Sequence, residues 1–154
     1  MRLAPAPSVA ESGRMGIGPR SYRIEHQLPE RLDSIRMSRE MTWRALTTCG
    51  YRGHHEDVIF VVSELVTNAL RHGSGAPTLC LTGGSSMVRV EVGDAGAELP
   101  PLGAEPGPGG TGLDVVRRLC SGWGVSPLQR GKVVWCELEA YLTVVVGGHD
   151  PAIA

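Results

Sequence analysis

Hydrophobic residues along this chain recur with two different periods, and each change of period predicts a new element. Tyr22, Ile24 and Leu28 alternate with polar neighbours, which predicts a half-buried strand. Helical spacing of the apolar residues begins at Pro29, a residue suited to the first turn of a helix. We therefore expect a helix over about residues 29–48.

This first helix carries two apolar stripes. Four residues fall within about 80° of arc and form the stripe expected to face the core: Leu32, Ile35, Trp43 and Leu46. Three more form a second stripe on nearly the opposite side: Met37, Met41 and Ala45. The second stripe is either a set of scattered surface residues or a protein-contact surface.

A second helical pattern begins near Asp57, and the elements after it are mainly strands. Turn residues at 73–77 end this helix, and residues 83–86 predict a hairpin. The remaining expected elements are strands at 78–82, 87–93, 123–126 and 132–138, and a third helix at about 111–120. Helices early and strands later predict an α+β fold: a two-layer α/β sandwich with helices packed on one face of a mixed, mainly antiparallel sheet.

The two ends of the chain and one internal stretch lack any such period. Residues 1–20 predict a disordered leader, residues 21–139 a single domain, and residues 140–154 a tail without an assigned element. Residues 95–110 contain four prolines and five glycines. A loop of this length inside a domain is usually functional or disordered.

Composition narrows the class of protein. The 154 residues are 42% hydrophobic and 20% charged, as in an ordinary soluble globular protein. A formal net charge of −1 lacks the basic surplus of most nucleic-acid-binding proteins, so no direct nucleic-acid partner is expected. No apolar run reaches the roughly 20 residues of a membrane span, and the first residues do not resemble a secretory signal. Four scattered cysteines without a C-x-x-C pair fit a reducing compartment, so we expect a cytoplasmic protein.

Candidate chemistry lies first on the second helix. At 100° per residue from Glu64, Asn68 falls at about 40° and Arg71 at about −20°, so the three share one face. The apolar residues of the helix occupy the other side. A carboxylate and a carboxamide one turn apart suit a hard cation and the phosphates that it bridges. The alternative is an ordinary polar stripe on an amphipathic helix.

A second candidate, Asp94-Ala95-Gly96, follows a predicted strand. The carboxylate of Asp94 can accept a hydrogen bond from the exocyclic amine of adenine, and Gly96 lets the backbone approach a flat ring. The alternative is turn chemistry, because Asp and Gly are both favoured in turns.

The third candidate, Gly109-Gly110-Thr111-Gly112-Leu113, opens the third helix. Glycine-rich backbone at a helix N-terminus offers N–H groups and a positive dipole end to phosphate oxygens. Thr111 and Asp114 also fit a capping box, which needs no ligand. The segment is not a Walker A motif, because no Gly-Lys-Ser/Thr follows at the proper spacing.

Taken in order, these segments resemble the Bergerat-type ATP-binding domain of the GHKL superfamily. Within that superfamily the chain is most similar to the small anti-sigma factor serine/threonine kinases. The segments that carry the resemblance are residues 61–69, 71–72, 94–96, 110–113, 123–125 and 131–135. The resemblance covers about residues 21–139, and the block from Glu64 to Asn68 is its most specific part.

The resemblance implies a role for each candidate residue. Asn68 would hold Mg²⁺ between the ATP phosphates, and Glu64 would be the catalytic carboxylate, polarising the attacking hydroxyl or water or completing the metal shell through water. The residues that it implies for ATP binding are Asn68, Arg71, Asp94, Gly96, Gly110, Thr111, Gly112 and Leu113. Asp94 would read the adenine amino group, and residues 97–109 would form a lid. Arg71 is either a phosphate contact or half of a structural ion pair.

Two positions depart from the pattern of the kinases. Glu98 stands where the family often has a second glycine, and Thr111 stands where the kinases commonly have an arginine. The glycine-rich block thereby looks like the histidine-kinase version. A missing cation near the terminal phosphate weakens the case for phosphoryl transfer more than the case for nucleotide binding.

The resemblance implies an anti-sigma-factor-type regulator that phosphorylates a serine or threonine of an anti-sigma factor antagonist and sequesters a sigma factor in its other state. The alternative is a catalytically weak or inactive ATP-binding module whose first helix and strand hold a protein partner. A homodimer is compatible with both. The catalytic end of a histidine kinase fits less well, because only 20 poorly patterned residues precede the first predicted strand.

Overall fold

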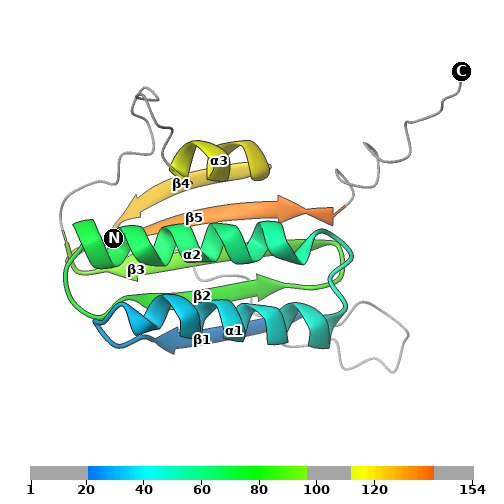
Figure 1. The fold of residues 1–154 in the computed structure, drawn as a ribbon. Helices are drawn as coiled ribbons and strands as arrows, with labels where there is room; N and C mark the ends of the chain where they lie inside the picture. Colours follow the sequence, from blue (N-terminus) through cyan, green and yellow to red (C-terminus); the bar gives the residue numbers. More distant parts are fainter. Residues whose placement is uncertain (1–20, 97–111, 141–154) are drawn as a thin grey trace, which may run out of the picture.

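The computed structural model describes residues 21–96 and 112–140, in which three helices cover one face of a five-stranded sheet (Figure 1). In chain order the elements are β1 (Tyr22–Gln27), α1 (Asp33–Cys49), α2 (His55–His72), β2 (Thr78–Gly83), β3 (Met87–Asp94), α3 (Gly112–Leu119), β4 (Gly122–Pro127) and β5 (Lys132–Glu139). The strand order is β1-β2-β3-β5-β4. The prediction of a two-layer α+β fold is confirmed. The sheet was expected to be mixed, but all four strand pairings in the described residues are antiparallel.

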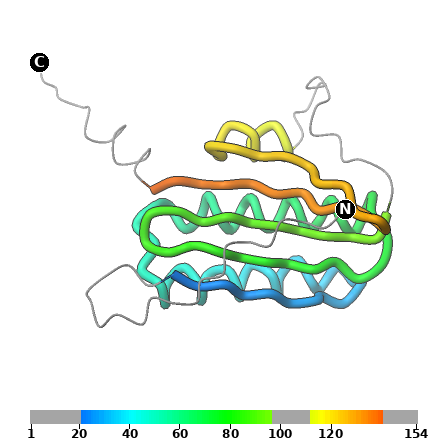
Figure 2. The backbone as a smooth tube through the Cα atoms, turned by 180° about the vertical axis from the view of Figure 1, so that it is seen from behind, coloured from blue at the N-terminus to red at the C-terminus, as the bar shows by residue number. Residues whose placement is uncertain are grey.

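The core lies between the sheet and α2. On β3, Val88, Val90 and Val92 are buried on the side that the helices cover, and α2 buries one apolar side against them. The uncovered face of the sheet is seen in Figure 2. There Arg89 forms ion pairs with Glu91 and Glu137 and lies over the ring of Trp135. This one-sided burial is why the strands alternate so regularly in the sequence.

Helix α1 begins later than the sequence predicted. Its first residue is Asp33, whereas Pro29 was expected to open the helix. The carbonyl of Pro29 instead accepts hydrogen bonds from the backbone N–H of Arg31 and the hydroxyl of Ser34. These bonds close a separate turn before the helix, which explains the shift.

The predicted core stripe of α1 is wrong at two of its four positions. Leu32 is 67% exposed and Trp43 is 51% exposed. The buried residues of α1 are Ser34, Ser38, Thr42, Ala45 and Leu46. The hydroxyls of Ser38 and Thr42 donate to carbonyls of their own helix, each at 2.7 Å, so burying them leaves no hydroxyl unpaired. A hydropathy pattern cannot detect such a face, because it counts these residues as polar.

Several sequence predictions fall outside the described residues. These are the leader at 1–20, the lid at 97–109, and the tail apart from Ala140, which is buried. Of the four cysteines, Cys80 and Cys136 are buried, and Cys49 and Cys120 are half-buried. Within residues 21–96 and 112–140, no helix combines the length and apolarity needed to cross a membrane.

Candidate functional site

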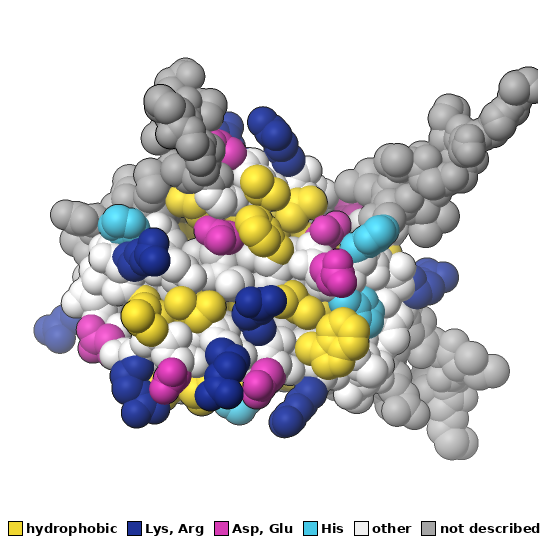
Figure 3. Space-filling model, in the orientation of Figure 1, with side chains coloured by type: hydrophobic (Ala, Val, Ile, Leu, Met, Phe, Trp, Pro, Cys, Tyr) yellow, Lys and Arg dark blue, Asp and Glu magenta, His cyan; other side chains and the backbone are white. Residues whose placement is uncertain are grey.

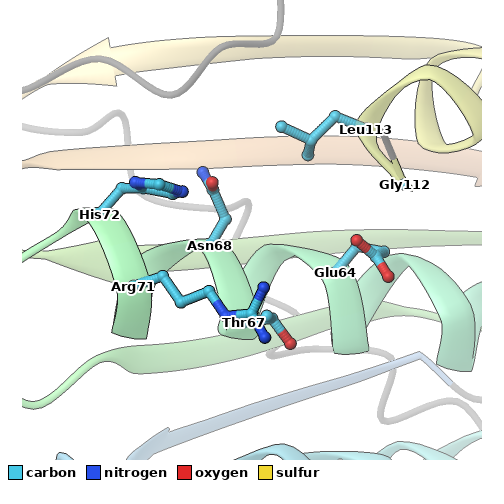
Figure 4. Close-up of a pocket in the computed structure, with 7 residues that line it drawn as sticks. All are labelled: Glu64, Thr67, Asn68, Arg71, His72, Gly112 and Leu113. Carbon is cyan, nitrogen blue, oxygen red and sulfur yellow. The ribbon is translucent and has the colours of Figure 1, made fainter. Parts of the chain in front are cut away.

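A pocket of about 250 Å³ lies between the polar side of α2 and the start of α3 (Figure 4). Its lining residues are Glu64, Thr67, Asn68, Arg71, His72, Gly112 and Leu113. Because α2 buries its apolar side against the sheet, these polar residues are left on the opposite side. The structure therefore brings together five of the predicted site residues. Three of them are on α2 (Glu64, Asn68 and Arg71), and two are at the start of α3 (Gly112 and Leu113).

Glu64 lies directly against the first residue of α3. A Cβ added to Gly112 would overlap the carboxylate of Glu64, so only glycine fits between them in this arrangement. The N-terminal end of α3, which carries a partial positive charge, thus faces the carboxylate. Figure 4 shows the side chains of Glu64 and Asn68 directed toward the α3 side of the pocket.

The oxygen atoms of this pocket fit a magnesium ion with bound phosphates. Mg²⁺ commonly takes one or two protein oxygens and completes its shell with water and phosphate. Glu64 and Asn68 offer such oxygens, while the hydroxyl of Thr67 already donates to the carbonyl of Ser63 at 2.7 Å. Arg71 also lines the pocket, and no ion pair within the described ranges includes it.

Asp94 is buried at the end of β3, on the helix side of the sheet. Its position continues the alternation of Val90 and Val92, and a Cβ on Gly73 would overlap its carboxyl group. Gly73 caps the C-terminal end of α2, five residues or roughly 7.5 Å along the helix from Asn68. Asp94 and Asn68 are therefore on the same side of the sheet, although Asp94 does not line the pocket beside Glu64.

The carboxylate of Asp94 is held by three donors on one oxygen. Its Oδ1 accepts from the backbone N–H of Gly96 at 2.7 Å, from that of Ser74 at 3.4 Å, and from Nζ of Lys132 at 3.0 Å. Gly96 is thus placed beside Asp94, as expected from the Asp-x-Gly segment. Gly110 and Thr111 lie outside the described residues.

Sequence reasoning missed three residues around Asp94. Lys132 pairs with it, Gly73 touches it, and Gly131 adopts a φ of 92° where a Cβ would overlap the Asp94 carbonyl. The signal for Lys132 is present in the sequence, because it occupies the inward register of β5 with Val134 and Cys136. A lysine at an inward position needs an acidic partner.

Comparisons with known proteins give matches among solved structures, but none among family models or curated proteins. The chain is similar to the RsbU and RsbW domains of a Mycobacterium tuberculosis protein, with a TM-score of 0.56 and 19% identity over 77% of this chain and 32% of that chain. It therefore spans about a third of that structure.

A second solved structure is the histidine kinase domain of a blue-light activated histidine kinase from Erythrobacter litoralis. Its TM-score is 0.48 and its identity 18%, over 80% of this chain and 66% of that chain. The likeness to the RsbW-containing structure concerns the fold alone, and it agrees with the two-layer α+β sandwich that the sequence predicted.

Proposed function

We propose that this chain binds ATP with Mg²⁺ and transfers the terminal phosphoryl group to a serine or threonine of a partner protein. The observation that carries the proposal is the pocket shared by Glu64, Asn68 and Gly112, together with Asp94, which is buried on the same side of the sheet against the C-terminal end of α2. One end of this arrangement suits phosphates and a cation, and the other suits a nucleobase.

In this proposal each residue has one task. The amide oxygen of Asn68 would hold Mg²⁺, and that ion would offset the negative charge of the phosphates. Glu64 accepts the proton of the attacking serine or threonine hydroxyl while the hydroxyl oxygen forms a bond to the γ-phosphorus. The bond from that phosphorus to the bridging oxygen breaks, and ADP keeps the bridging oxygen. The N-terminal end of α3, which lies against Glu64, would stabilise the negative charge that develops on the transferred phosphoryl group.

The proposed partners follow from the resemblance to the anti-sigma factor kinases. The acceptor would be an anti-sigma factor antagonist, and the protein would sequester a sigma factor in its other state, within the cytoplasm. The likeness to an RsbW-containing structure supports the choice of this group. Titration of the protein with ATP, with and without Mg²⁺, followed by transfer of label from γ-labelled ATP to a candidate antagonist, tests the proposal. Absence of ATP binding would overturn it.

Gly112→Ala is expected to lower phosphoryl transfer at least tenfold without lowering stability. The added methyl group meets only the flexible end of Glu64, so the carboxylate moves while the fold persists. Alanine is also the better helix former, by up to about 1 kcal/mol. Transfer rates and thermal unfolding measure the two effects. Val115→Ala, an exposed change on the same helix, is the control, and an unchanged rate in Gly112→Ala would contradict the assignment.

A second candidate function is a non-catalytic protein-binding module, and the exposed Trp43 favours it. A surface cavity of about 590 Å³, here called the α1–α2 groove, is lined by Arg39, Trp43, Glu56, Ile59, Phe60, Ser63 and Glu64. Hydrophobic side chains gather on this helical face of the molecule (Figure 3). Trp43 is held edge-on against the ring of His55 at 5.4 Å, so it offers a fixed apolar contact.

Trp43→Ala is expected to lower the affinity for the antagonist or sigma partner tenfold or more, because buried tryptophans often contribute about 2 kcal/mol or more at interfaces. ATP affinity should stay unchanged. Leu32→Ala is a matched control, since Leu32 is an exposed apolar residue of the same helical region that does not line the groove. Calorimetric titration measures both affinities, and equal losses for the two variants would rule out a special role for the groove.

A further inference from the structure

Lys132 is a buried lysine at the start of β5, directly across from Asp94 in the β3–β5 register. Its ammonium donates to Oδ1 of Asp94 at 3.0 Å and to the carbonyl of Gly96 at 3.3 Å. The side chains of the ion pair are 5% and 2% exposed. This lysine therefore contacts both ends of the Asp-x-Gly segment.

The burial of this pair calls for an explanation beyond packing. Removing two charges from water is costly, and a buried ion pair is often no more stabilising than apolar residues of the same size. The inward positions that follow Lys132 on β5 are apolar, as at Val134 and Leu138. An apolar residue at position 132 would continue that pattern, whereas Lys132 instead supplies a charge that pairs with Asp94.

Lys132 leaves one oxygen of Asp94 for another partner. All three hydrogen bonds described for the carboxylate end on Oδ1, and Oδ2 takes part in none of them. Three donors on one oxygen fix the plane of the carboxylate, and therefore the direction of the other oxygen. The bond from Lys132 to the Gly96 carbonyl fixes the backbone beside it.

We infer that Lys132 is a positioning residue that selects adenine, by anchoring Oδ1 of Asp94 so that Oδ2 is presented to the exocyclic amine. The inference rests on the proposed ATP-binding function. A carboxylate only accepts hydrogen bonds, so it matches the amine of adenine and opposes the carbonyl that guanine carries at the same ring position. Lys132 itself does not contact the nucleotide.

A double-mutant cycle on nucleotide affinity tests this role. The variants are Lys132→Met, Asp94→Asn and the combination, each titrated with ATP, GTP and inorganic tripolyphosphate in the presence of Mg²⁺. Lys132→Met should weaken ATP binding about tenfold and reduce the preference for ATP over GTP, while tripolyphosphate affinity changes less than about twofold. In the Asp94→Asn background, Lys132→Met should change ATP affinity by less than about twofold.

Arg89→Met is the control, because Arg89 is likewise a cation of the sheet paired with carboxylates, but on the uncovered face. It should leave all three affinities unchanged. Equal losses of ATP and tripolyphosphate affinity in Lys132→Met, or an undiminished loss in the Asp94→Asn background, would overturn the inference.

The same measurements separate this inference from the proposed function. If the wild-type protein does not bind ATP, both fall. If Asp94→Asn selectively weakens ATP and Lys132→Met does not, the adenine role of Asp94 stands and only the role of Lys132 is overturned. If Lys132→Met does not fold, comparing the double variant with Asp94→Asn still decides, since a further tenfold loss of ATP affinity would contradict the inference.

Discussion

Asn68→Ala is expected to lower the affinity for ATP with Mg²⁺ about a hundredfold while the protein stays folded. The change removes the proposed metal ligand from the pocket side of α2, and a hundredfold loss corresponds to about 2.8 kcal/mol. Alanine is a better helix former than asparagine, so α2 itself should not be weakened. Titration calorimetry with and without Mg²⁺ measures the effect.

Thr67→Ala provides the control for Asn68. Thr67 lines the same pocket, but its hydroxyl is already bonded to the carbonyl of Ser63. ATP affinity in this variant should remain within about threefold of the wild-type value, given the modest worth of a neutral hydrogen bond. Unchanged affinity in Asn68→Ala would remove the metal assignment, whatever the control shows.

Glu64→Gln is expected to lower the rate of phosphoryl transfer by about 10²- to 10⁴-fold, the range typical for loss of a general base. The amide keeps the size of the carboxylate, so the contact with Gly112 and the affinity for ATP should persist. Single-turnover transfer of labelled phosphate to the antagonist measures the rate. An antagonist that is phosphorylated equally fast by wild type and variant would exclude Glu64 as the base.

Asp57→Asn controls for the loss of a negative charge on the same helix. Asp57 is in the first turn of α2 and lines neither the pocket nor the α1–α2 groove, so transfer should proceed at the wild-type rate. If neither wild type nor variants transfer phosphate while ATP still binds, the non-catalytic module is favoured. That outcome would agree with the threonine at position 111, where the resemblance to the kinases leads us to expect an arginine.

The sheet was predictable because only one of its faces is covered. Buried and partly exposed residues alternate along β5, so period two appears directly in the sequence and places the strand within one residue of its observed bounds. Helix α2 was equally clear, because its apolar side is made of large aliphatic residues. Helix α1 was also predicted, but its buried face was not, since that face includes Ser34, Ser38 and Thr42, whose hydroxyls bond to backbone carbonyls.

The candidate site also has a part that the local sequence predicts and a part that depends on tertiary contacts. Helical geometry alone brings Glu64, Asn68 and Arg71 to one face, so this part followed from local sequence. The approach of Gly112 to Glu64 is a tertiary contact, and it was expected only through the resemblance to a known domain. The pair of Asp94 and Lys132 joins residues 38 apart in sequence, so the inward position of Lys132 indicates an acidic partner but spacing does not identify which one.

The contact between Gly112 and Glu64 has an energetic corollary. A ligand that enters between α2 and α3 must either fit around this contact or separate the two groups, and the work of separation is subtracted from its affinity. Binding and the closeness of the two helices are then linked reciprocally, so a change that tightens the contact must weaken any ligand that opens it. Helix α3 and the ligand would then compete for the space beside the Glu64 carboxylate. Bulkier ligands would lose more affinity to this competition than small ones.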